Sequence, residues 1–211
     1  MVACNFLNYA NLTECQSSTS AHARKVFGHT IPTEIGLLTQ LTALHMFSKQ
    51  LIGTLPSTLG NLIQLTYLGL HSNQLTNTIP STFGNLIQLN HLYLQDNLLT
   101  GNIPSALGNL KHLNYLYLHH NELIGTVPST LGNLIHLNHL YLHNNELKGA
   151  APSTLGNLTQ LKDLYLYDNR LTGTLSSSLC SISGIEIRID CNMEEDIVCS
   201  CCIDYELLPC T

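Results

Sequence analysis

The sequence contains no tryptophan, and only 6% of its 211 residues are aromatic and 10% are charged. Soluble domains typically carry about 25% charged residues, so amide, hydroxyl and imidazole side chains must supply most of the polar surface. The eight Lys and Arg residues form no cluster, and the formal net charge is −6. Because nucleic-acid binding needs a basic face, we expect no nucleic-acid partner. No apolar run approaches the about 18 residues of a spanning helix, so we expect no membrane segment in this chain.

The sequence also lacks the motifs of common catalytic sites. It has no nucleophile-elbow sequence, no Gly-rich phosphate loop and no paired-carboxylate signal. We therefore predict that the chain is not an enzyme and needs no cofactor. Eleven His residues offer possible metal ligands, but a metal site also needs ligands that converge and are held by further hydrogen bonds. The sequence specifies neither, so we predict no metal site.

A repeat of 24 residues organises the chain. Its six units begin at Leu38, Leu62, Leu86, Leu110, Leu134 and Leu158, and the fourth reads LKHLNYLYLHHNELIGTVPSTLGN. A degenerate half-unit, GHTIPTEIG, precedes them, and a shortened unit, ISGIEIRIDCN, follows them. Such periodicity is typical of solenoids, in which each unit buries its apolar face against the next.

The pattern within a unit predicts its local structure. Leu113, Leu116 and Leu118 nearly alternate with polar or aromatic residues, which predicts a short strand with one buried face. An Asn then ends the strand, and its amide can bond backbone groups of neighbouring turns. These structural Asn residues are Asn73, Asn97, Asn121, Asn145 and Asn169. A Gly follows where the chain bends, and a Pro begins the return segment, which we expect to be helical or irregular.

The units match the leucine-rich repeat signature L-x-x-L-x-L-x-x-N, and the continuation L-x-G-x-[IVL]-P-x-x-L-G-N-L resembles the plant-type subclass. That subclass includes ectodomains of receptor-like kinases, receptor-like proteins and polygalacturonase inhibitors. The resemblance implies an α/β solenoid, a right-handed superhelix with a parallel concave β-sheet. We expect an N-terminal cap, or the remnant of one, over 1–27, the repeat array over 28–182 and a Cys-rich C-terminal cap over 183–211.

Three positions depart from the pattern. Lys49 replaces the structural Asn in the first unit, Asn77 replaces the Gly in the second, and Ser176 replaces the Pro in the sixth. These departures predict less regular turns at the two ends of the array.

The variable strand positions are the candidate binding site. Side chains between the buried Leu residues should point to the concave side, where they form three columns in which Tyr and His are concentrated. Tyr is enriched at binding hot spots, so we predict that a protein or peptide ligand binds there. The predicted ligand-binding residues are Tyr67, His91, Tyr93, Tyr115, Tyr117, His119, His139, Tyr141, His143, Asp163, Tyr165 and Tyr167.

Other interpretations of the same features stay open. The Tyr column could be duplicated scaffold whose rings stack on each other, or it could bind the apolar faces of sugars in a cell-wall polysaccharide. The His residues could make binding sensitive to pH. The return segments carry columns of small hydroxyls that could match ice or could simply allow close stacking. These columns are Ser57, Ser81, Ser105, Ser129 and Ser153, and Thr58, Thr82, Thr130 and Thr154.

The cysteines gather at the two ends of the chain: Cys4, Cys15, Cys180, Cys191, Cys199, Cys201, Cys202 and Cys210. An even number in this arrangement favours disulfide-bonded caps in an oxidising compartment. Asn11 and Asn157 begin Asn-Leu-Thr tripeptides and are candidate glycosylation sites. We therefore expect an extracellular or cell-surface location. The opening residues do not resemble a signal peptide, so we expect the N-terminus to be incomplete.

Overall fold

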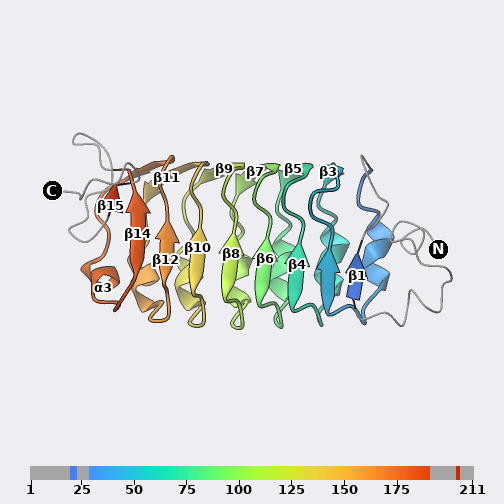
Figure 1. Cartoon of the computed structure of the whole chain (residues 1–211), viewed down its shortest axis with the longest axis horizontal. Coiled ribbons are helices and arrows are strands. Elements are labelled where there is room, and N and C mark those ends of the chain that lie inside the picture. Colours follow the sequence, from blue (N-terminus) through green and yellow to red (C-terminus); the bar gives the residue numbers. More distant parts are fainter. Residues whose placement is uncertain (1–19, 23–28, 191–202, 205–211) are drawn as a thin grey trace.

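The computed structural model describes residues 20–22, 29–190 and 203–204. One strand from each coil contributes to a parallel sheet of nine strands, in the order β1-β2-β4-β6-β8-β10-β12-β14-β15. In Figure 1 these strands lie side by side along the long axis and point the same way. Their bounds are Ser20–His22, Ala43–His45, Tyr67–Gly69, His91–Tyr93, Tyr115–Tyr117, His139–Tyr141, Asp163–Tyr165, Glu186–Ile189 and Ile203–Asp204. The predicted solenoid with a parallel sheet is confirmed.

Each strand of the first sheet from β2 to β12 buries the Leu at its centre. Leu92 and Leu116 are fully buried, whereas His91 and Tyr93 on either side of Leu92 are half-buried. Ladder partners between these strands lie 24 residues apart, so that His91 pairs with Tyr115 and Tyr93 with Tyr117. Identical positions of successive units therefore become neighbours, which is the arrangement the period predicted.

The structural Asn residues connect the coils, as predicted. Asn97 Oδ1 accepts from the Leu75 amide at 3.0 Å, and its Nδ2 donates to the Leu70 and Leu94 carbonyls at 3.1 Å. Leu70 and Leu75 belong to the preceding coil, so one side chain joins two turns. Asn121 repeats these bonds one coil further along.

Short 3-10 helices form the return segments. They are η1 (Thr33–Leu37), η2 (Ser57–Asn61), η3 (Ser81–Asn85), η4 (Ser105–Asn109), η5 (Ser129–Asn133) and η6 (Ser153–Asn157). Each begins after a Pro held in extended backbone, such as Pro56 at φ −65°. A methyl group on Gly60 would lie 2.4 Å from the Thr82 carbonyl oxygen. The Gly of S-T-L-G-N is therefore required by the close approach of neighbouring helices.

A second parallel sheet, of six strands, was not predicted. It follows the structural Asn residues in the order β13-β11-β9-β7-β5-β3, and lies along one edge of the solenoid (Figure 1). The strands are β3 (Ile52–Thr54), β5 (Gln74–Thr78), β7 (Leu98–Asn102), β9 (Glu122–Gly125), β11 (Glu146–Ala150) and β13 (Arg170–Thr172). The sequence predicts a bend here, because most units carry a Gly in this stretch, such as Gly101 in β7 and Gly125 in β9.

That Gly position requires left-handed backbone. Gly101 has φ +72° and Gly125 φ +79°, and Asn77, which replaces the Gly in the second unit, has φ +67°. Asn tolerates this conformation better than most side chains. The departure therefore leaves the second sheet continuous, since β5 pairs with β3 and β7.

The other two departures are also accommodated. The backbone amides of Lys49 and Leu51 donate to Asn73 Oδ1 at 2.9 and 3.0 Å, so Asn73 bonds the first unit even though that unit lacks its own Asn. At Ser176 the 3-10 helix gives way to a short α-helix, α3 (Ser177–Cys180), and Ser176 Oγ accepts from the Ser178 amide at 3.4 Å.

The first sheet continues past the limits predicted for the repeat array. β1 precedes residue 28, and β14 and β15 follow residue 182. Cys180, at the end of α3, is disulfide-bonded. The other seven cysteines and Asn11 lie outside the described residues, so the disulfide connectivity and the caps stay predictions. Asn157 is exposed at the end of η6. No helix within 20–22, 29–190 and 203–204 is long and apolar enough to cross a bilayer.

Candidate functional site

The predicted ligand-binding residues lie together on the exposed face of the first sheet. We call their three columns the aromatic face. Column one holds Tyr67, His91, Tyr115, His139 and Asp163; column two holds Tyr93, Tyr117, Tyr141 and Tyr165; column three holds His119, His143 and Tyr167. Column one is fixed by strands β4 to β12, whose buried central Leu residues turn the flanking side chains outward.

Column two is a stack of nearly parallel rings. The centroids of Tyr117 and Tyr141 are 4.4 Å apart with an interplanar angle of 4°, and those of Tyr141 and Tyr165 are 4.4 Å apart at 2°. Tyr93 joins the stack 4.8 Å from Tyr117. Because the rings cover each other's faces, the column presents ring edges outward. The rings thus stack on each other, and the face offers little flat ring surface to a sugar.

Column one stacks in the same manner. Tyr115 lies between His91 and His139, with centroid distances of 4.6 and 4.9 Å and interplanar angles of 7°. Tyr115 also meets Tyr117 of column two edge-on, at 6.2 Å and 90°. The columns thus support each other through edge-to-face contacts, which are favourable for aromatic rings. The aromatic face is consequently a continuous packed layer.

Column three places imidazoles in apolar surroundings. The rings of His119 and His143 stack at 4.3 Å, and His143 stacks on Tyr167 at 4.5 Å. His143 is only 6% exposed. Burial, with a smaller contribution from nearby imidazoles such as His120, lowers the pKa of His119 to about 4 and that of His143 to about 3. These imidazoles therefore stay neutral in a mildly acidic medium. They would not contribute to the pH-sensitive binding suggested for the His residues.

Tyrosine hydroxyls and charged groups meet at the C-terminal end of the face. Tyr141 Oη donates to Asp163 Oδ2 at 3.1 Å, and His139 Nδ1 contacts the same oxygen. Tyr165 Oη donates to Glu186 Oε1 at 2.9 Å, and this bond lowers the pKa of the Glu186 carboxyl. Burial raises the pKa of Tyr141, so its phenol remains a neutral donor.

Sequence reasoning missed Glu186 and Arg188. They extend columns one and two, because Glu186 pairs with Asp163 and Arg188 with Tyr165. The Arg188 guanidinium lies 4.8 Å from the Tyr165 ring centroid and donates to Glu186 Oε1 at 2.6 Å. Aligning the shortened unit ISGIEIRID with the complete units would have placed both residues on the aromatic face.

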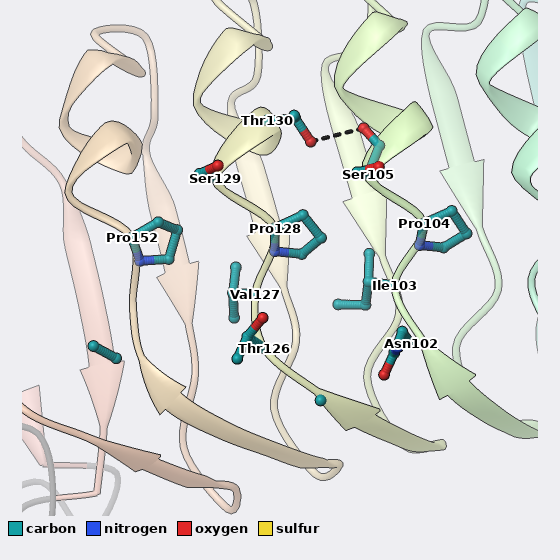
Figure 2. A pocket seen from close by; sticks show the side chains of 12 residues that line it. Asn102, Ile103, Pro104, Ser105, Thr126, Val127, Pro128, Ser129, Thr130 and Pro152 are labelled. Carbon is teal, nitrogen blue, oxygen red and sulfur yellow. Dashed lines mark hydrogen bonds between the residues drawn. The ribbon is translucent and has the colours of Figure 1, made fainter.

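A shallow groove of about 810 Å³ lies on the return side, over coils three to five. Figure 2 shows its prolines, Pro104, Pro128 and Pro152, in a row on neighbouring coils. None of the lining residues is charged. The groove therefore offers small apolar and hydroxyl groups.

The Thr hydroxyls beside this groove are bonded within the protein. Thr130 Oγ1 donates to the Ser105 carbonyl at 2.7 Å (Figure 2), and Thr82 Oγ1 donates to the Ser57 carbonyl at 2.7 Å. Thr58 and Thr154 make the same bond to the coil before them. The Thr column thus joins neighbouring coils. This supports the interpretation that these small residues allow the coils to pack closely.

The family follows from the match to sequence families. The model described as "Leucine-rich repeat region" matches residues 80–199, more than half of the chain, and one described as "Leucine Rich Repeat" matches 64–86. The chain belongs to the leucine-rich repeat family. A comparison with curated proteins finds no match.

Solved plant structures share this fold. The ectodomain of the receptor kinase GASSHO1/SCHENGEN3 from Arabidopsis thaliana, in complex with CASPARIAN STRIP INTEGRITY FACTOR 2, is 36% identical over 85% of this chain and 22% of its own, with a TM-score of 0.78. The Arabidopsis HAESA ectodomain, in complex with an IDA peptide hormone, is 32% identical over 85% of this chain and 29% of its own, at 0.74. A plant ice-binding protein is 28% identical over 84% of this chain and 60% of its own, at 0.65.

This leucine-rich repeat chain spans less than a third of the two receptor ectodomains. These structures have plant-type leucine-rich repeats, the subclass that the sequence motif after the structural Asn indicated.

Proposed function

We propose that the chain is a non-enzymatic recognition module that binds a protein or peptide ligand across its aromatic face, in an extracellular or cell-surface setting. The observation that carries the proposal is the continuous layer of Tyr and His side chains in register on adjacent strands. The layer is held rigid by ring stacking, as between Tyr117 and Tyr141 at 4.4 Å. A rigid surface loses little conformational entropy when a ligand binds.

The chemistry of the face favours an extended peptide. Ring edges and hydroxyls can meet both apolar side chains and backbone amides of a ligand, since Tyr combines an apolar ring with a polar tip. Two solved ectodomains with this fold are in complex with CASPARIAN STRIP INTEGRITY FACTOR 2 and with an IDA peptide hormone, and they support this ligand class.

Charge at one end of the face should orient the ligand. The Asp163 carboxylate lies at the end of the Tyr stack, and its side chain is 21% exposed. Partly buried carboxylates attract basic groups more strongly than fully solvated ones. We therefore expect a bound peptide to place a Lys or Arg side chain near Asp163.

Selection from a random displayed peptide library on the immobilised full chain tests the proposal. Selected peptides should bind a Tyr117→Ala/Tyr141→Ala variant at least roughly tenfold more weakly, since interface hot spots contribute more than about 1 kcal/mol each. A Ser105→Ala/Ser129→Ala variant, changed in the return-side groove, serves as the control and should bind normally. Equal binding to both variants would contradict the proposal.

Two further measurements sharpen the interpretation. A Tyr117→Phe/Tyr141→Phe variant keeps both rings and removes both hydroxyls, so it separates hydrogen bonding from loss of the stack. An Asp163→Asn variant should weaken binding of peptides that carry Lys or Arg and reduce their dependence on salt.

Binding of a cell-wall polysaccharide is the alternative function. It would need ring faces free to lie against sugar rings, whereas the faces in column two are covered by neighbouring rings. An array of plant cell-wall oligosaccharides tested with the same variants distinguishes the two ligand classes. Sugar binding that is lost in the Tyr117→Ala/Tyr141→Ala variant, together with an empty peptide selection, would replace the peptide proposal.

Ice binding on the return segments is a third hypothesis. A plant ice-binding protein among the structural neighbours favours it, whereas the inward bonds of the Thr hydroxyls count against it. The test is thermal hysteresis of the purified chain, compared with that of the Ser105→Ala/Ser129→Ala variant.

A further inference from the structure

Asp96, His119 and His120 meet at the rim of the aromatic face, just beyond the ends of strands β6 and β8. One possible ligand atom from each of these side chains lies within 4.8 Å of the other two. Asp96 and His120 are exposed, while His119 is half-buried in column three. Two imidazoles and a carboxylate thus converge at a place that solvent can reach.

The backbone fixes where these side chains lie. Asp96 and His120 both have left-handed backbone, with φ +56° and +51°, at the same position of consecutive coils. The Asp96 amide donates to the His119 carbonyl at 3.2 Å, and the Asn97 amide donates to the His120 carbonyl at 3.2 Å. The three residues are therefore held against each other by the ladder that joins the coils.

Hydrogen bonds and ring contacts hold the side chains further. His120 Nδ1 and Asp96 Oδ1 lie 2.9 Å apart, and Ser72 Oγ donates to Asp96 Oδ2 at 3.4 Å. The His119 ring stacks on His143 at 4.3 Å and meets the His120 ring at 5.2 Å. The carboxylate has a supporting partner and the half-buried imidazole is packed, as metal ligands usually are.

We propose that Asp96, His119 and His120 bind a divalent transition-metal ion, with Zn²⁺ as the best fit. Imidazole nitrogen and carboxylate oxygen lie about 2.0–2.2 Å from Zn²⁺ in a tetrahedral site, so the ligand atoms of one ion are about 3.3–3.6 Å apart. The three ligand atoms lie within 4.8 Å of one another, so side-chain rotations that move the more distant ones about an ångström closer would suffice. Three protein ligands leave a coordination position open to solvent or to a bound ligand.

The sequence alone predicts no metal site, because it does not show which possible ligands converge. Asp96 and His120 lie outside the three columns of the aromatic face, on a rim row with left-handed backbone that comprises Ser48, Ser72, Asp96, His120, Asn144 and Asp168. Within this row, Asp96 and His120 are the neighbouring pair that combines a carboxylate with an imidazole. Asp96 and His120 are 24 residues apart in the sequence, and only the stacking of the coils brings them together.

Titration of the full-length, disulfide-intact chain with Co²⁺ and Zn²⁺ at neutral pH tests the site. Calorimetry should detect one Zn²⁺ per chain. The Co²⁺ spectrum should show d–d bands without a thiolate charge-transfer band, which distinguishes this site from cysteine binding. Asp96→Asn and His120→Gln should each weaken Zn²⁺ binding by at least roughly tenfold. Both residues are exposed, so these variants should fold.

Matched controls come from the same molecule. Asp168→Asn changes a carboxylate in the same rim row, three coils beyond Asp96 and outside the His cluster. His112→Gln changes an exposed imidazole whose ring lies 6.4 Å from His136, outside the rim. Both should bind Zn²⁺ as the unmodified chain does. The proposal is overturned if no Zn²⁺ binds, if Asp96→Asn and Asp168→Asn bind equally well, or if the Co²⁺ spectrum shows thiolate ligation.

Discussion

The rings of Tyr117 and Tyr141 lie 4.4 Å apart and within 4° of parallel, although 24 residues separate them in the chain. This distance is close to the about 4.8 Å spacing of neighbouring strands. The sheet itself therefore sets the stacking distance. The rings of column two stack at this distance, so the Tyr column contributes to stability as well as forming the proposed binding surface.

Substitutions at Tyr141 separate these two contributions. Tyr141→Leu should lower the free energy of unfolding by about 1–3 kcal/mol, because it removes two stacked pairs worth about 0.5–1.5 kcal/mol each. Tyr141→Phe keeps both pairs and loses the hydrogen bonds of one hydroxyl, to Asp163 and with Tyr117, so we expect a loss of about 1 kcal/mol. Urea unfolding measures both values. Equal losses would mean that stacking contributes nothing.

The repeat period predicted the first sheet because each 24-residue unit contributes a strand to it. Leu92, Leu116 and their equivalents could be assigned to the core, and the Tyr and His columns to the opposite face, from alternation alone. Whether rings expose their faces or their edges depends on side-chain rotamers, which alternation does not determine. The stacking of Tyr117 on Tyr141 was consequently one of two open interpretations.

Two features depended on information that the repeat pattern does not carry. The second sheet contains left-handed residues such as Gly101 and Asn77, and a Gly in a short segment normally suggests a bend. The cluster of Asp96, His119 and His120 joins residues from two coils at a turn. Its three residues do not occupy one column of the repeat, so reading the sequence column by column does not reveal the cluster.

The structural Asn residues offer a second stability test. Asn97→Ala should lower the free energy of unfolding by about 1–3 kcal/mol. It leaves the Leu75 amide without the side chain that bonds it, and an unpaired buried group costs about 1–3 kcal/mol, whereas the Leu70 carbonyl keeps its bond from Asn73 Nδ2 at 2.8 Å. Gln88→Ala, an exposed position in the same coil, should change the value by no more than about 0.5 kcal/mol. Similar losses in the two variants would argue against the role of Asn97.

Close helix packing makes Gly60 hard to replace. Gly60→Ala should destabilise the chain by about 1–3 kcal/mol or more, because its methyl group would lie 2.4 Å from the Thr82 carbonyl oxygen, a backbone atom. Gly184→Ala is the comparison: no atom lies within 4 Å of its added methyl group, but its φ is +73°, so only the backbone penalty of about 1 kcal/mol remains. Thermal unfolding of both variants measures the difference. A smaller loss at Gly60 than at Gly184 would show that the helices can move apart.

Acid should destabilise the fold through His143. The unfolded chain protonates this imidazole near its usual pKa of about 6.5, whereas burial lowers the folded-state pKa to about 3. Between these values the unfolded state binds the extra proton, so the free energy of unfolding falls as the pH falls, by up to about 1.4 kcal/mol per pH unit. His119 contributes in the same direction.

Replacing His143 by Phe tests this linkage, because Phe keeps a ring between His119 and Tyr167 but cannot take up a proton. Urea unfolding between about pH 6 and pH 4 should give a slope that is shallower by nearly one proton in the His143→Phe variant. His136→Phe, at an exposed position, is the control and should retain the original slope. Parallel slopes for the unmodified chain and the His143→Phe variant would mean that His143 is protonated as readily in the folded chain as in the unfolded one.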